Sequence, residues 1–166
     1  MSRYPLAFGL AFLLAGCAGY RLGPTLGAEY RSVAVVMFGN KTYQAQIERP
    51  ITTAIIRQFQ SDGTLRVESP SDADLILTGE VTQYRRQLLR SQPNDNNAPR
   101  EYEINVEVRV EVRDRGGKLI IGPKTLTGKA ATFIGSDLQS AEEQAMPLVA
   151  QDLAKQVVTL VAEKWN

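Results

Sequence analysis

Apolar and polar side chains alternate without interruption between residues 101 and 113. The apolar set is Tyr102, Ile104, Val106, Val108, Val110 and Val112, and the polar set is Glu103, Asn105, Glu107, Arg109 and Glu111. A period of two residues is that of a β-strand. A strand with one apolar and one charged face is typical of an antiparallel sheet that is covered on one side only. This stretch therefore requires a sheet with one buried and one solvated face.

The neighbouring segments predict the partners of this strand. The sequence Asp-Arg-Gly-Gly at residues 114–117 predicts a hairpin turn, and Gly122-Pro123 indicates a kink or an edge position in the strand that follows. The alternation that begins at Asp74 changes phase near Gln83, which indicates a bulge. Gly39-Asn40 predicts a turn after the first strand. Strands are expected over residues 31–38, 64–68, 74–90, 101–113 and 118–129.

Two segments have helical periodicity. Apolar residues recur at helical spacing over residues 46–62, and Pro50 places the start of the regular helix near Glu48, with Gly63 as its stop. The sequence Ser-Ala-Glu-Glu at residues 140–143 predicts a capping box for a second helix. Pro147 predicts a restart or kink in that helix, which is expected to end near Trp165.

The order of these segments predicts an α/β (α+β) fold. We expect a two-layer sandwich in which two helices pack on one face of a mostly antiparallel sheet of four to five strands. The polar, Pro-bounded residues 92–99 predict a mobile loop between two of the strands.

The start of the chain resembles a bacterial lipoprotein leader. Arg3 precedes an apolar run over residues 6–14, which is too short to span a bilayer because a span needs about 20 residues. The sequence Leu-Ala-Gly-Cys that ends at Cys17 resembles a lipobox, and Cys17 is the only cysteine. The resemblance implies cleavage before Cys17, with diacylglycerol on its thiol and an N-acyl chain on its amine. An ordinary signal peptide with an unmodified thiol is the alternative.

These segments predict the domain organisation and location. We expect residues 1–16 to be a removed signal peptide, residues 17–30 a lipidated tether, and residues 31–166 a single domain. Two or more acyl chains give stable membrane anchoring. Ala18 stands where an Asp would resemble an inner-membrane retention signal. Delivery to the cell outer membrane, facing the periplasm, is therefore expected.

The composition excludes several classes of function. The chain has no histidine, and its single cysteine is expected to carry lipid. Ser-His-Asp and Cys-His catalysis and His/Cys zinc sites are therefore excluded. Because Arg3 is the one charge in the leader, the remaining chain has 18 basic and 18 acidic residues, and this balance argues against a nucleic-acid binder. No enzyme, catalytic residue, metal or cofactor other than the acyl chains is expected; a hydrolase using an Asp/Glu pair is the remaining enzymatic alternative.

Several segments together resemble the LPS-assembly lipoprotein (LptE) family. They are Gly19-Tyr20, residues 33–43, residues 72–80, the alternating strand and the segment from Asp152 to Trp165. The resemblance implies a non-catalytic lipoprotein that plugs the lumen of the LptD β-barrel and supports delivery of lipopolysaccharide (LPS) to the outer leaflet. Residues 33–43 and 72–80 also resemble periplasmic lipoproteins that activate peptidoglycan synthases or serve in curli-type secretion, which is the alternative.

Basic residues are concentrated in the middle of the chain. Residues 81–136 contain 10 basic and 6 acidic residues. The candidates for binding LPS phosphates are Arg85, Arg86, Arg90, Lys118, Lys124 and Lys129, with Arg115 nearby. Arg offers paired donors to a phosphate and Lys a point charge. The alternative is an ordinary solvated sheet face. The loop over residues 92–99 likewise either reaches a barrel wall or is a simple connection.

Overall fold

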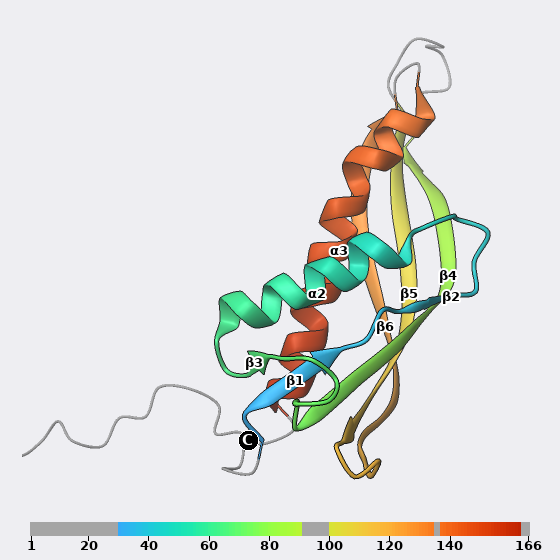
Figure 1. Ribbon diagram of the computed structural model, residues 1–166. Coiled ribbons are helices and arrows are strands. Elements are labelled where there is room, and N and C mark those ends of the chain that lie inside the picture. Colours follow the sequence, from blue (N-terminus) through green and yellow to red (C-terminus); the bar gives the residue numbers. More distant parts are fainter. Residues whose placement is uncertain (1–29, 91–99, 135–136, 164–166) are drawn as a thin grey trace, which may run out of the picture.

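The computed structural model describes residues 30–90, 100–134 and 137–163, and Figure 1 shows one sheet with both helices on the same side of it. The elements are β1 (Ser32–Val35), β2 (Gly39–Asn40), α2 (Glu48–Asp62), β3 (Arg66–Val67), β4 (Leu75–Arg90), β5 (Arg100–Asp114), β6 (Leu119–Ile134) and α3 (Leu138–Glu163). The predicted two-layer α+β fold is confirmed, with a sheet of six strands. The predicted leader, Cys17 and its tether, the loop over residues 92–99 and Trp165 lie outside the described residues.

The sheet combines a long antiparallel part with a short parallel part. Its order is β3-β1-β4-β5-β6, and β2 pairs with β4 off this path. β4, β5 and β6 form an antiparallel meander, whereas β1, β2 and β3 make only parallel pairs. The sequence predicts a turn at Gly39-Asn40, but these residues form β2 opposite Glu80 and Val81, and this strand accounts for the higher strand count.

The long strands follow the predicted pattern. Ile104, Val106, Val108, Val110 and Val112 of β5 are all buried against the helices. The β4–β5 register passes from Val81–Val108 to Gln83–Glu107, which confirms a bulge beside Gln83. The β5–β6 register passes from Val110–Lys124 to Val112–Ile121, so Gly122 and Pro123 stand outside the ladder. Since β6 is the last strand in the sheet order, the predicted edge position is confirmed, and the irregular register lies where the alternative, a kink, was predicted.

Helix α2 begins and ends where its sequence predicts. It starts at Glu48, with Pro50 in the first turn, and Gly63 ends it in the left-handed conformation at φ 73°. Thr52 is buried in α2 and fixes the segment that precedes the helix. Its hydroxyl donates to the Glu48 carbonyl at 2.8 Å and accepts the Phe38 N–H at 3.1 Å.

Helix α3 differs from its prediction at two points. The predicted cap at Ser140 is wrong, because α3 starts at Leu138 and the Asp137 carboxylate accepts the Gln139 N–H at 3.0 Å. The predicted restart at Pro147 is also wrong, since Pro147 lies inside one continuous helix. Pro147 has no backbone N–H to donate within the helix. Burial of Val149 and Leu153 against the sheet stabilises the helix despite the lost hydrogen bond.

A glycine in β6 sets the separation between α3 and the sheet. A Cβ atom on Gly128 would lie 2.5 Å from Leu153 Cγ and 2.9 Å from the Val149 carbonyl oxygen. The helix therefore rests directly on the strand backbone at this point. The same helix also packs against α2, so α3 contacts both the sheet and the other helix.

Candidate functional site

The antiparallel register assembles a row of polar side chains on the solvated face of the sheet. Arg85 of β4 lies opposite Asn105 of β5, and Asn105 lies opposite Lys129 of β6. This row is the centre of a depression of about 490 Å³, which we call the strand hollow. Its lining consists of Arg85, Arg86, Gln87, Glu103, Asn105, Glu107, Thr127 and Lys129.

Acidic side chains share the strand hollow with the basic ones. Arg85 Nη2 lies 2.7 Å from Glu107 Oε1, and Asn105 Nδ2 donates to Glu103 Oε1 at 3.0 Å. The Lys129 side chain makes no ion pair with a carboxylate in the described part of the chain. The strand hollow can therefore offer an anion the free ammonium of Lys129 and the remaining N–H groups of Arg85.

The other sequence-predicted basic residues lie apart from this row. Arg86 borders the strand hollow but extends toward the helices, where its Nη1 lies 2.8 Å from Glu142 Oε1 of α3. Lys124 is opposite Val110 and so belongs by register to the helix-facing side of β6. Lys118 lies in the β5–β6 turn, where its N–H donates to the Asp114 carboxylate at 2.9 Å.

The two remaining basic residues lie at opposite ends of the sheet. Arg115 lies 3.8 Å from Asp74 and donates to the backbone carbonyls of Asp72 and Ala73, so it fastens the β5–β6 turn to the start of β4. Arg90 is the last residue of β4, opposite Glu101. The structure thus brings together Arg85 and Lys129, with Arg86 beside them, and separates Lys118, Lys124 and Arg115 from that group.

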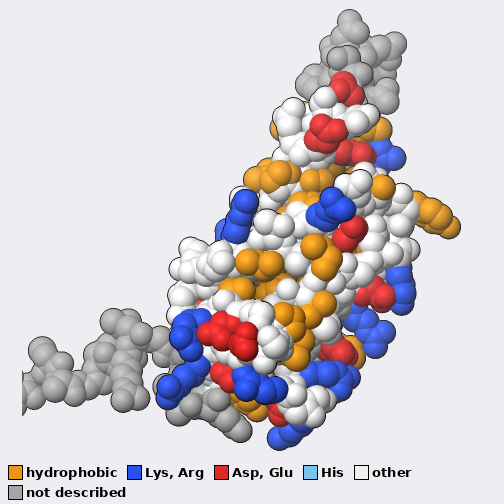
Figure 2. Space-filling model, in the orientation of Figure 1, with side chains coloured by type: hydrophobic (Ala, Val, Ile, Leu, Met, Phe, Trp, Pro, Cys, Tyr) orange, Lys and Arg blue, Asp and Glu red, His pale blue; other side chains and the backbone are white. Residues whose placement is uncertain are grey.

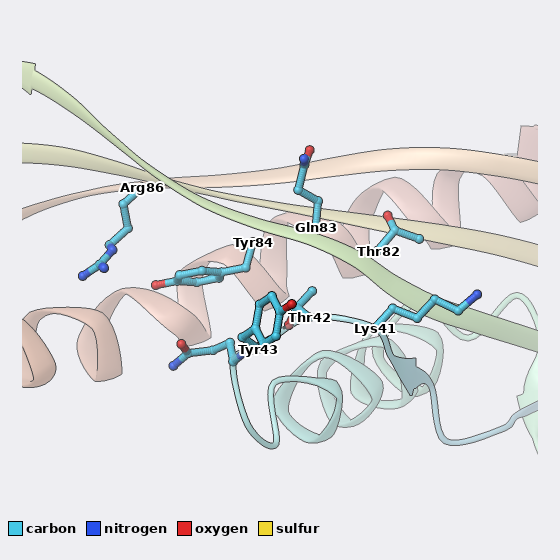
Figure 3. A pocket seen from close by; sticks show the side chains of 8 residues that line it. Lys41, Thr42, Tyr43, Thr82, Gln83, Tyr84 and Arg86 are labelled. Carbon is cyan, nitrogen blue, oxygen red and sulfur yellow. Dashed lines mark hydrogen bonds between the residues drawn. The ribbon is translucent and has the colours of Figure 1, made fainter.

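A second depression, which sequence reasoning missed, lies where β2 ends and β4 continues. Figure 3 shows side chains of β4 and of the segment after β2 around this space of about 540 Å³. Its lining consists of Lys41, Thr42, Tyr43, Gln44, Thr82, Gln83, Tyr84 and Arg86. Asn40 shapes the segment, because it accepts the Thr42 N–H and donates to the Gln44 carbonyl, both at 2.8 Å. The predicted bulge beside Gln83 is the one sequence feature from which this depression could have been inferred.

Tyr84 joins this second depression to helix α3. Burial raises the pKa of its phenol to about 12, and the negative charge of Glu142 acts in the same direction. Arg86, which is paired with the same carboxylate, opposes the shift. The phenol is therefore protonated at neutral pH and is available as a hydrogen-bond donor.

The described residues hold no group suited to a metal ion or to a membrane span. Within residues 30–90, 100–134 and 137–163, no three His, Cys, Asp or Glu residues form a potential metal cluster. No helix in this same part of the protein is sufficiently long and apolar to cross a bilayer.

The fold is similar to that of several bacterial lipoproteins. A minor lipoprotein from Acinetobacter baumannii has a TM-score of 0.56 and 21% identity, covering 81% of this chain and 94% of that one. A hypothetical protein from Chlamydia trachomatis has a TM-score of 0.56 and 16% identity, with coverage of 81% and 97%. Uncharacterized lipoprotein B from Nitrosomonas europaea has a TM-score of 0.53 and 12% identity, with coverage of 85% and 91%. At these identities the similarity concerns the fold alone.

The family is shown by the sequence itself. No curated protein matches the chain at a significant level. The family model described as "LptE: Lipopolysaccharide-assembly" matches residues 30–161, which include every described strand and nearly all of both helices. The protein therefore belongs to the LptE family of lipopolysaccharide-assembly lipoproteins.

Proposed function

We propose that this protein is an outer-membrane lipoprotein that binds and plugs an LptD-type β-barrel and assists LPS assembly at the cell surface. The observation that carries the proposal is the family match over residues 30–161. The lipobox-like sequence before Cys17 supports anchoring through diacylglycerol and an N-acyl chain. In this function the protein binds and positions its partners and catalyses no reaction.

The strand hollow is the part of the molecule proposed to meet LPS. Arg85 and Lys129 lie in one cross-strand row, and together they present two positive charges to a phosphate of lipid A. Arg86 borders the strand hollow but is paired with Glu142, so it is expected to contribute less to LPS binding than Arg85 and Lys129. Lys118 and Lys124 lie outside the strand hollow and would meet LPS only as separate contacts.

A pull-down from outer membranes tests the function. Tagged full-length protein is extracted in mild detergent, its partners are identified by mass spectrometry, and LPS is assayed in the eluate. We expect a large β-barrel in stoichiometric amount together with LPS. Recovery of the protein alone, or with a peptidoglycan synthase in place of a barrel, would overturn the proposal.

A double substitution tests the strand hollow separately. Arg85→Ala with Lys129→Ala should lower the LPS recovered per barrel at least tenfold, because each hydrogen bond to a charged group contributes about 1.5–3 kcal/mol. The barrel itself should still be recovered. Arg31→Ala with Arg66→Ala removes the same charge from the opposite end of the sheet and should leave LPS recovery unchanged. Equal losses in both variants would exclude a specific role for the strand hollow.

The anchor has its own test. Cys17→Ala should abolish incorporation of radioactive palmitate and remove the protein from the outer-membrane fraction, because no acyl chain can then be attached. A Cys17→Ala protein that is still labelled and still in that fraction would refute lipidation at Cys17.

A further inference from the structure

A groove runs between the exposed sides of α2 and α3. Figure 2 views the molecule from the helical side, where hydrophobic side chains lie among basic and acidic ones over the two helices. The groove has a volume of about 500 Å³, and small apolar side chains, Ala54, Ala150 and Ala154, form its floor. We call it the helix groove. It lies on the opposite side of the sheet from the strand hollow.

The basic residues of the helix groove lack acidic partners. Arg49, Arg57 and Lys155 line it, and none of them makes an ion pair with a carboxylate of the described residues. No Asp or Glu side chain is part of its lining. The positive charge of the helix groove is therefore uncompensated within the described domain, and it favours an anionic occupant.

The acidic side chains of α3 are engaged elsewhere. Glu142 pairs with Arg86 at 2.8 Å, and the Asp152 carboxylate accepts the Lys129 N–H at 3.0 Å and the Gln156 amide at 3.2 Å. These contacts turn both carboxylates toward the sheet. Glu142 and Asp152 thus fasten the helix to the strands, Glu143 accepts from the Gln139 amide at 3.0 Å within the helix, and none of the three lines the helix groove.

The spacing and the lining of the helix groove indicate the kind of anion. Arg49 and Arg57 are eight residues apart in α2, a rise of about 12 Å. About four residues of extended polypeptide span that distance. Gln58 and Gln151 add side-chain amides, which pair well with peptide groups.

We infer that the helix groove binds an acidic segment of a partner polypeptide, one that carries two carboxylates about 12 Å apart. Arg49 and Arg57 contact the two carboxylates, and Lys155 closes the groove from α3. The inference requires neither the barrel nor LPS, so either it or the proposed function can fail alone.

Site-specific photo-crosslinking in intact outer membranes tests the inference. Full-length protein carries p-benzoylphenylalanine in place of Gln151, which lines the helix groove, or in place of Thr125 on the solvated face of β6 as a control position. We expect crosslinking from position 151 to a polypeptide whose mapped segment contains at least two Asp or Glu residues within about five positions. A lipid or LPS adduct, a segment without acidic residues, a second copy of this chain or no adduct would each overturn the inference.

Charge reversal shows whether the basic residues cause the binding. Arg49→Glu, Arg57→Glu and Lys155→Glu together should lower the crosslinking yield at least tenfold. The matched variant Arg31→Glu, Arg66→Glu and Arg109→Glu makes the same change in net charge outside the helix groove and should retain the yield. Thermal unfolding confirms that both variants are folded, as expected for substitutions at exposed positions. If both variants crosslink as well as the parent protein, binding does not depend on the groove cations and the inference is wrong.

Discussion

The strand hollow and the helix groove have nearly the same size and the same number of basic residues, but they differ in how those residues are paired. Their volumes are about 490 and 500 Å³, and three Lys or Arg side chains line each. In the strand hollow, Arg85 lies 2.7 Å from Glu107 and Arg86 lies 2.8 Å from Glu142. In the helix groove, no described carboxylate pairs with a basic residue. A count of basic residues therefore does not measure how strongly a surface attracts an anion.

The difference follows from the two kinds of secondary structure. Diagonal neighbours on adjacent strands lie about 7–8 Å apart, which long side chains can bridge, so a register that places Arg85 diagonally to Glu107 brings their side chains into contact. The basic residues of the helix groove lie on two separate helices, and Glu142 and Asp152 of α3 are engaged with strand residues. A phosphate in the strand hollow must compete with Glu107, whereas an anion in the helix groove has no internal competitor.

The largest expected effect comes from moving the helix that forms one wall of the groove. Gly128→Val should destabilise the protein by about 3 kcal/mol, because the new side chain must displace Leu153 and the α3 backbone. Denaturant unfolding measures the loss. Gly122→Ala is the control, since its Cβ would meet only Leu119 Cδ2 at 4.0 Å. If Gly128→Val were as stable as the control, α3 would not be seated on β6 as described, and the helix groove would lose its defined shape.

The next largest effect on stability is expected in α2, which forms the other wall of the helix groove. Thr52→Val should destabilise the protein by about 2 kcal/mol, because it leaves the buried N–H of Phe38 without an acceptor. Thr53→Val, one residue further and exposed on the helix groove, should change stability by less than about 0.5 kcal/mol. Equal effects in chemical denaturation would show that the hydroxyl of Thr52 does not fix α2 to the segment after β1.

The sequence predicted those parts of the fold in which local chemistry and burial act together. Alternation gave β5, the phase change gave the bulge beside Gln83, and Pro50 with Gly63 gave both ends of α2. It failed at Ser140, because Asp137 three residues earlier offers an equivalent cap and accepts both the Gln139 N–H and the Ser140 hydroxyl. The restart that was one of two alternatives at Pro147 is also absent, because burial of Val149 and Leu153 outweighed the local preference for a break, whereas the kink stays a prediction.

The candidate sites were less predictable than the fold. The sequence showed that basic residues are concentrated in the middle of the chain, but only the register shows that Arg85 and Lys129 share a row and that Lys124 belongs to the other face. The helix groove could not be found in the sequence, because Arg57 and Lys155 are far apart in the chain and ordinary on a helix surface. The sequence also does not show which carboxylates already pair with basic residues, because such pairs join residues that are distant in the chain.

A smaller effect is expected at alkaline pH where α3 meets β4. In the unfolded chain Tyr84 ionises near its ordinary pKa of 10.0, but in the folded protein its pKa is about 12. Unfolding therefore releases a proton between these values, and stability should fall as the pH rises from about 10 through about 12. Tyr84→Phe should reduce this fall, as measured by denaturant unfolding across that range. Tyr43→Phe, which alters an exposed ring, should not. The same fall in all three proteins would assign it to other groups.

The smallest effect compares one arginine from each surface. A double-mutant cycle with Arg85→Ala and Glu107→Ala should give a coupling of about 0.5 kcal/mol that decreases with added salt, because the pair is partly exposed. Arg57→Ala should leave stability unchanged or raise it slightly, because it removes repulsion from Arg49 and Lys155 and breaks no described ion pair. Salt should therefore change the two single-mutant effects in opposite directions. If Arg57→Ala instead lowered stability and salt reduced that loss, Arg57 would have an acidic partner within the protein, and the charge of the helix groove would already be compensated.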